Sequence, residues 1–168
     1  VAASMYMAIE HAQMRATLQA RMGQGERERR DLRDVRERLL QVLEHGRIAI
    51  ALQPIVRLAD GVVVGHEALA RFPLEYDLST GRWFEDAART GLSVELELAA
   101  AAAALARFAS LPPETFLSVN VSPETACSDR LRQLIAGHDL RRLVLEITEH
   151  TPVDDYGRLN QRLSALPE

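Results

Sequence analysis

Residues 48–72 read IAIALQPIVRLADGVVVGHEALARF, and this stretch decides the fold. Apolar residues alternate with other residues in IAIALQPIV, the segment Ala59-Asp60-Gly61 supplies a tight turn, and a second apolar run follows it. Two such runs joined by a short turn are typical of a β-hairpin. We therefore expect two antiparallel strands, over residues 48–56 and 62–72.

Downstream of this hairpin, helical and strand patterns alternate along the chain. We expect helices over residues 84–89, 94–109, 129–136 and 155–166, and strands over residues 116–121 and 143–148. Strands separated by helices of this kind form βαβ units, which produce a parallel sheet. The sequence therefore predicts the α/β class.

Upstream of the hairpin we expect two helices, over residues 1–22 and 26–45, separated at Gly23 and Gly25. The second helix carries an apolar stripe among many charged residues. Two interpretations stay open: a solvated connector with one packing face, or a signalling helix that pairs with its copy in a dimer. We assign residues 1–45 to a linker from an upstream sensory domain and residues 46–168 to the domain that carries the function.

The composition of the chain limits the kinds of partner and the cellular compartment that we expect for it. The net charge is −4 and the isoelectric point is about 5.8, which argues against a polymeric nucleic acid or an anionic membrane surface as partner. The longest apolar run, Leu98 to Leu105, is far too short to span a membrane. The single cysteine, Cys127, excludes an internal disulfide and fits a reducing cytoplasm.

Polar side chains share one face near the carboxyl ends of three expected strands. On the second strand, every second residue points to the same face, so Glu67, Leu69 and Arg71 share it. Asn120 lies on the third strand and Glu146 on the fourth. Active sites of α/β proteins are built at these strand ends, and carboxylate and amide oxygens suit Mg²⁺ or Mn²⁺. Spacing alone leaves two interpretations open: Glu67, Asn120 and Glu146 converge on a cation, or they are polar strand ends that cap loops.

Three segments in order resemble the EAL domain family. They are LQPIV with VVGHEALARF, which contains Glu67-Ala68-Leu69, then SVNVSP at residues 118–123, and LEITE at residues 145–149. The resemblance extends over about residues 48–166. It implies a (β/α)8 TIM-like barrel whose first strand is antiparallel, present here as its first part with an N-terminal helical extension. It also implies a bacterial signalling protein that hydrolyses the second messenger cyclic-di-GMP to pGpG.

The resemblance further implies a role for each matching residue. Metal ligands for two divalent cations, Mg²⁺ or Mn²⁺, would be Glu67, Asn120 and Glu146. Catalytic residues would be Glu67 and Glu149, the latter supporting a loop beside the metals. Residues that contact the substrate would be Gln53, Leu69 and Arg71, with Arg71 on a phosphate.

Some family features are missing. Ala88 and Arg89 stand where the family usually has an acidic pair. An Asp-Asp pair, a lysine and a further glutamate follow later in the family, whereas this sequence ends at Glu168 and all 20 of its basic residues are arginine. We therefore expect the natural protein to continue, and residues 1–168 alone to be inactive.

Two further expectations concern the intact protein. The alternative to an enzyme is a degenerate EAL domain that acts as a cyclic-di-GMP receptor or a protein-interaction module. We also expect a homodimer, formed through the EAL domain or the helical linker, and an upstream sensor that resembles a GAF domain.

Overall fold

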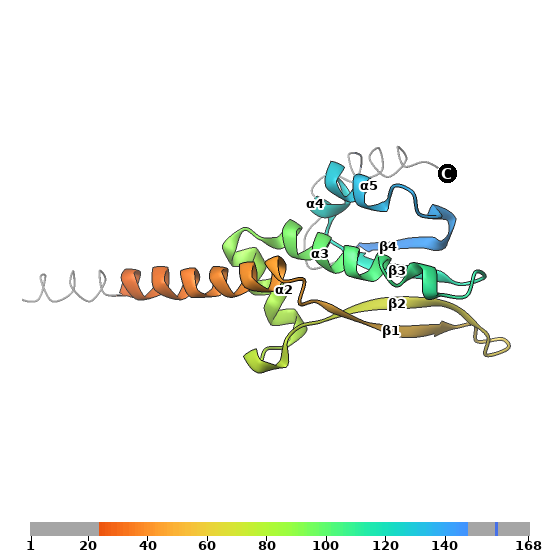
Figure 1. Ribbon diagram of the computed structural model, residues 1–168, viewed down its shortest axis with the longest axis horizontal. Helices are drawn as coiled ribbons and strands as arrows, with labels where there is room; N and C mark the ends of the chain where they lie inside the picture. Colours follow the sequence, from red (N-terminus) through yellow and green to blue (C-terminus); the bar gives the residue numbers. More distant parts are fainter. Residues whose placement is uncertain (1–23, 148–156, 158–168) are drawn as a thin grey trace, which may run out of the picture.

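The centre of the protein is a four-stranded sheet with the order β1-β2-β3-β4 in a computed structural model that describes residues 24–147 and residue 157 (Figure 1). Strand β1 (Ala49–Val56) pairs antiparallel with β2 (Val63–Arg71), whereas β2, β3 (Phe116–Val121) and β4 (Leu143–Ile147) are parallel. The predicted hairpin and parallel sheet are thereby confirmed.

Helices connect the parallel strands. In chain order these elements are η1 (Leu74–Tyr76), α2 (Thr80–Thr90), α3 (Ser93–Leu105), η2 (Phe108–Ser110), α4 (Pro123–Ala126), α5 (Asp129–Ile135) and η3 (Leu140–Arg142). Helix α3 contacts β1 and β3, and α4 and α5 pack beside it, so the helices cover one face of the sheet. Within the described part of the chain, no helix has the length and apolar character of a membrane span.

Two helix boundaries differ clearly from the predictions, and one short helix was not predicted. Helix α2 begins at Thr80 because the Ser79 hydroxyl accepts a hydrogen bond from the Arg82 backbone N–H, so Gly81 lies inside the helix and not in a loop. Helix α3 ends at Leu105, and the 3₁₀ turn η2 follows it. The short helix α4 was not predicted; Ser122 caps it and a proline occupies its first turn.

One hydrophobic cluster lies between the sheet and its helices. Leu117, Val119 and Val121 of β3 are almost fully buried in it, together with apolar residues of α3 and α5. Successive side chains of a strand point to opposite faces, so the intervening residues Ser118 and Asn120 point away from the helices. Because Leu117, Val119 and Val121 are buried against the helices, Ser118 and Asn120 are the β3 side chains on the opposite face of the sheet.

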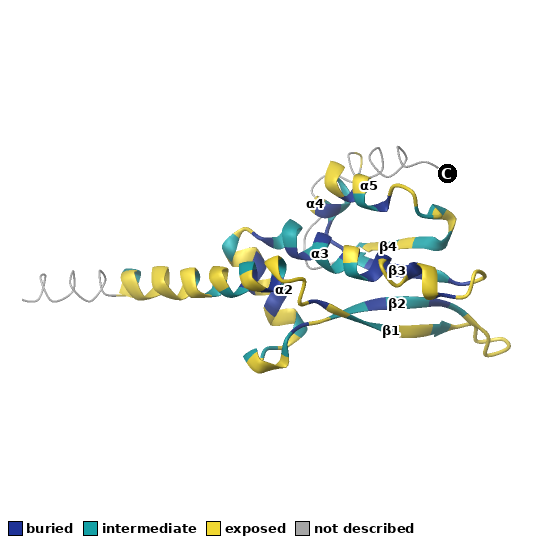
Figure 2. Cartoon of the chain, in the orientation of Figure 1, coloured by how far each residue is buried: buried dark blue, intermediate teal, exposed yellow. Residues whose placement is uncertain are grey.

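A second hydrophobic cluster joins the helix over residues 24–44 to α2. Leu39, Val42 and Trp83 have no exposed surface, and Phe72 at the end of β2 packs with them. Figure 2 shows that the earlier part of the same helix is mostly exposed. The domain boundary after residue 45 stays a prediction, but the last turns of this helix share a core with α2.

The helix over residues 24–44 includes Gly25, so the predicted interruption at this glycine was wrong. A glycine inside a helix costs only about 1 kcal/mol relative to alanine, which a long helix tolerates. The predicted helix over residues 1–22 lies outside the described residues, as does the one over residues 155–166 apart from residue 157.

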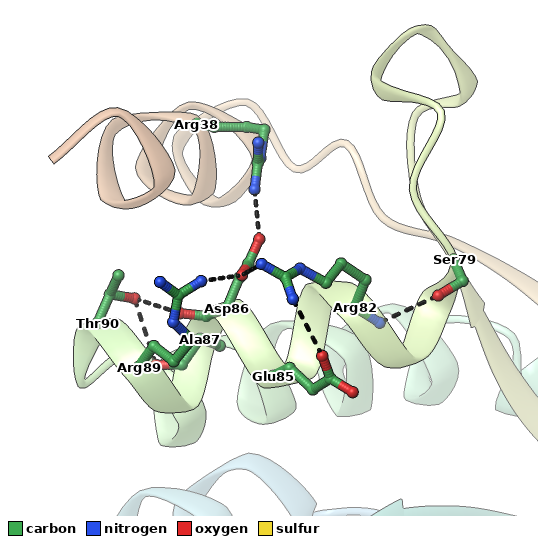
Figure 3. A network of polar contacts seen from close by, with 8 residues as sticks. All are labelled: Arg38, Ser79, Arg82, Glu85, Asp86, Ala87, Arg89 and Thr90. Atoms are coloured by element: carbon green, nitrogen blue, oxygen red, sulfur yellow. Dashed lines mark hydrogen bonds and ion pairs between the residues drawn. The ribbon is translucent and has the colours of Figure 1, made fainter. Parts of the chain in front are cut away.

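The buried Asp86 carboxylate links α2 to the helix over residues 24–44 (Figure 3). The Asp86 side chain is 1% exposed, and its oxygens lie 2.5 Å from Arg38, 3.1 Å from Arg82 and 3.2 Å from Arg89. Arg82 and Arg89 belong to α2, whereas Arg38 comes from the helix over residues 24–44. The Arg36 guanidinium also donates to the backbone oxygen of Thr90, at 2.8 Å. Polar contacts thus accompany the apolar packing between the helices.

We expect Leu117→Ala to lower the free energy of unfolding by about 2–5 kcal/mol, because it leaves a cavity in the cluster under the sheet. Leu58 is 97% exposed at the tip of the hairpin, so Leu58→Ala is a matched control with an expected change below about 0.5 kcal/mol. Urea unfolding followed by circular dichroism measures both. Equal midpoints for the two variants would contradict the assigned core.

Candidate functional site

The candidate site lies on the sheet face that points away from the helices. Glu67 of β2 pairs in register with Ser118 of β3, and Asn120 of β3 pairs with Glu146 of β4. Register partners on parallel strands project from the same face. The structure therefore places the three predicted metal ligands on one face of three neighbouring strands, near the carboxyl ends of β3 and β4.

Glu67 and Asn120 are in direct contact. The Asn120 Nδ2 donates a hydrogen bond to Glu67 Oε1 at 2.9 Å, and both side chains are half-buried. The contact crosses the boundary between β2 and β3, which are separated in the chain by α2 and α3. Two of the three ligands are thus already adjacent, and rotation of the amide would turn its oxygen toward a shared cation.

Glu146 of β4 is hydrogen-bonded to Ser118 of β3. The Ser118 hydroxyl has no exposed surface and donates to Glu146 Oε1 at 2.5 Å, whereas the glutamate itself is exposed. Ser118 lies two residues before Asn120 and therefore on the same face of β3, but the sequence did not indicate a role for it. The structure shows that Ser118 is the register partner of Glu67 and that its hydroxyl bonds to Glu146.

The predicted substrate contacts lie alongside Glu67. In the β1–β2 pair, Gln53 is opposite Glu67, and Leu69 and Arg71 follow Glu67 on the same face of β2. Gln53 and Arg71 are exposed and Leu69 is half-buried. The Arg71 guanidinium donates to the backbone oxygen of Ala70, and no carboxylate of the described residues pairs with it. Its positive charge is therefore available to an anionic ligand.

The donor set agrees with a hard divalent cation. Glu67 and Glu146 offer carboxylate oxygens and Asn120 an amide oxygen, a combination that Mg²⁺ and Mn²⁺ prefer over softer sites. Among the described residues, no three or more His, Cys, Asp and Glu side chains are grouped to hold a metal ion. The predicted loop residue Glu149 lies outside those residues. Glu67, Asn120 and Glu146 are therefore the described residues that could hold a cation, and such a site would need further ligands from other groups or from water.

Hydrogen bonds to Glu97 hold the carboxyl end of β3, and the sequence did not indicate a role for this residue. Glu97 of α3 accepts hydrogen bonds from both the backbone N–H and the hydroxyl of Ser122, each at 2.8 Å. Ser122 is buried and also caps α4, so it belongs to the helical layer. These bonds fix the strand end two residues after Asn120.

Known proteins resemble this chain in sequence and in structure. It is 30% identical over 140 residues to the probable cyclic di-GMP phosphodiesterase PdeB of Escherichia coli K12, a match that covers 74% of this chain and 26% of PdeB. The FimX EAL domain of Xanthomonas citri, solved in complex with c-diGMP, superposes with a TM-score of 0.68 at 21% identity, covering 83% of this chain and 58% of that one. The latter match shows the fold.

A second solved structure is more similar in sequence. Klebsiella pneumoniae BlrP1, solved at pH 6 as a manganese/cy-diGMP complex, is 26% identical and superposes with a TM-score of 0.58, covering 71% of this chain and 32% of BlrP1. The chain spans about a third or less of the length of the curated relatives that it matches.

The family model for the EAL domain matches residues 36–168, which is most of the sequence. The match includes the last turns of the helix over residues 24–44, in agreement with the packing of Leu39 and Val42 against α2. With the fold and the three sequence segments, this match establishes the family: the chain belongs to the EAL domain family.

Proposed function

We propose that the protein containing this chain hydrolyses cyclic-di-GMP to pGpG with two divalent cations, Mg²⁺ or Mn²⁺. The observation that carries the proposal is the placement of Glu67, Asn120 and Glu146 on one face of three neighbouring strands. The manganese/cy-diGMP complex of BlrP1 and the activity in the name of PdeB support the choice of ligand and metal class.

Each side chain has a role in this proposal. Glu67, Asn120 and Glu146 would hold the cations, which when bound would activate a water molecule and offset charge on the phosphoryl oxygens. Glu149 would support a loop beside them. Arg71 binds a phosphate because its planar guanidinium matches two phosphate oxygens. Gln53 and Leu69 contact the remainder of the ligand.

The spacing along β2 suits a ligand larger than one phosphate. Glu67 and Arg71 are four residues apart on one strand face, which corresponds to about 13 Å along the strand. A ligand that reaches both the metal-binding carboxylate and the guanidinium must therefore lie along β2, and half-buried Leu69 lies between them. A dinucleotide with two phosphates meets this requirement better than a single small anion does.

We also propose a cellular location and an oligomeric state for this protein. We place it in the cytoplasm, consistent with its single cysteine, and in a homodimer formed through the EAL domain or the helix over residues 24–44. Leu32 supports the helical contact, because it extends the apolar stripe of Leu39 and Val42 into the part of the helix that is mostly exposed.

Glu67→Gln in the complete natural protein is expected to lower kcat/KM for cyclic-di-GMP roughly a thousandfold, because it removes one metal-binding charge worth several kcal/mol in the transition state. Formation of pGpG with Mg²⁺ or Mn²⁺, followed by chromatography, measures this. Glu114→Gln changes an exposed glutamate just before β3 and is expected to leave turnover intact. Unchanged turnover in Glu67→Gln would overturn the metal assignment.

The unsubstituted protein separates the enzyme from the receptor alternative. Production of pGpG supports the enzyme. Binding of cyclic-di-GMP, measured by calorimetry, without any pGpG in the presence of either metal would overturn the hydrolysis and favour a receptor that uses the same surface. Absence of both binding and turnover would overturn the ligand assignment itself.

Ser118→Ala is expected to weaken Mn²⁺ binding about 10- to 100-fold, since it removes the hydrogen bond that orients Glu146. Calorimetric titration of Mn²⁺ without substrate measures this effect independently of turnover. Ser110→Ala is the matched control, because the exposed Ser110 hydroxyl bonds only locally, to the Arg107 backbone oxygen. The same Mn²⁺ affinity in both variants would show that the Ser118 hydroxyl does not orient the ligand.

A further inference from the structure

Trp83 of α2 lies between the helix over residues 24–44 and the end of β2. One contact is with Arg38, whose guanidinium carbon lies 5.3 Å from the centre of the indole ring. Another is with Phe72, whose ring stacks on Trp83 at 4.9 Å with an interplanar angle of 13°. The Trp83 side chain has no exposed surface. Arg38 and Phe72 are therefore linked through one buried ring.

The Phe72 ring is constrained by further contacts and is only 8% exposed. Phe84 packs edge-on against it at 5.7 Å, and Tyr76 packs edge-on against Trp83 at 5.4 Å. A ring held by aromatic neighbours in a close-packed interior cannot shift without displacing them. The backbone at residue 72 is thus fixed by the same cluster that contacts Arg38.

Arg71 directly precedes Phe72 and is the last residue of β2. Its exposed guanidinium bonds only to the neighbouring backbone oxygen of Ala70, so no side chain within the described part of the chain holds it by an ion pair. The position of Arg71 therefore depends on its own backbone, and hence on the anchoring of Phe72.

Arg38 is itself held in a defined position. Its Nη2 atom donates to Asp86 at 2.5 Å, and Asp86 is a buried charge that would be costly to leave without partners. Leu39 and Val42 are fully buried on the same helix. This combination of a directional ion pair and apolar contacts allows the helix over residues 24–44 one register on α2.

We propose that Arg38 is a positioning residue for Arg71. It acts through Trp83 and Phe72, so that phosphate binding by Arg71 depends on how the helix over residues 24–44 is seated on α2. This inference rests on the proposed function, because the phosphate contact of Arg71 is part of that proposal. It adds a route by which a displacement of the upstream helix changes affinity for the dinucleotide.

The first experiment compares Arg38→Ala with Arg82→Ala in the complete natural protein. Both variants remove a guanidinium from Asp86, but Arg82 lies on the same helix as Asp86 and does not bridge to the preceding helix. We expect Arg38→Ala to raise the KM and the Kd for cyclic-di-GMP about tenfold with kcat nearly unchanged. Arg82→Ala is expected to change either constant less than twofold. Equal effects of the two variants would overturn the inference.

A double-mutant cycle tests whether the effect passes through Arg71. In an Arg71→Ala background, Arg38→Ala should cause no additional loss of affinity, because the side chain that it positions is already absent. An additional tenfold loss in that background would show that Arg38 acts by another route. If the unsubstituted protein does not bind cyclic-di-GMP, the proposed function fails first, and this outcome is distinct from normal binding with an inert Arg38.

Trp83 supplies a readout that does not depend on turnover, since it is the single tryptophan of this chain. Its emission is obtained as the difference between the protein and Trp83→Phe, and we expect cyclic-di-GMP to change this emission through Phe72. Arg38→Lys keeps the charge near Asp86 and the indole ring, so it should retain most of the affinity if Arg38→Ala is too unstable to study. The proposal would be contradicted if Trp83 emission did not change when cyclic-di-GMP binds. It would also be contradicted if Arg38→Lys bound cyclic-di-GMP as weakly as Arg71→Ala does.

Discussion

Strands β2, β3 and β4 run parallel in a shared register, and a strand places every second side chain on the same face. Leu117, Val119 and Val121 must be buried under the helices. Once they are, Ser118 and Asn120 have to project from the opposite face, where Glu67 and Glu146 lie on the adjoining strands. The position of the polar side chains is therefore a consequence of hydrophobic burial, and the site needs no separate arrangement of the backbone.

The helices serve this arrangement in two places. Glu97 of α3 accepts hydrogen bonds from Ser122 and so holds the end of β3 beside Asn120. Asp86 of α2, with its three arginine partners, holds the preceding helix against the aromatic cluster at the end of β2. The first contact acts on a proposed metal ligand and the second on a proposed phosphate ligand. In the proposed function, these side chains take no part in the chemistry but position the residues that do.

Local sequence patterns were sufficient for the strands and for the face of the site. The two-residue period of the strands and the order of the segments predicted the antiparallel hairpin, the parallel strands and the shared face of Glu67, Leu69 and Arg71. Helix α2 was predicted too short because Gly81 suggested a loop, although Ser79 carried the signal of a helix cap. A capping hydroxyl outweighed the poor helix propensity of one glycine.

Contacts between distant residues could not be predicted in this way. Arg38 and Asp86 are 48 residues apart, and nothing near either residue indicates its partner. The bond from Ser118 to Glu146 likewise depends on the register of two strands that a helical segment separates. The identity of the three metal-binding candidates followed from strand spacing and family resemblance, whereas the residues that support them required coordinates.

The order β1-β2-β3-β4 in the sheet is also the order of the strands in the chain. Each new strand therefore pairs with the one made just before it, and no position has to be kept vacant for a later segment. The β1–β2 hairpin closes a short loop at a small entropic cost, whereas each parallel pairing brings together residues that a helical segment separates and therefore forms more slowly. During synthesis the hairpin is therefore expected to form first, and β3 and β4 can join it only after the helical segments that precede them have been made.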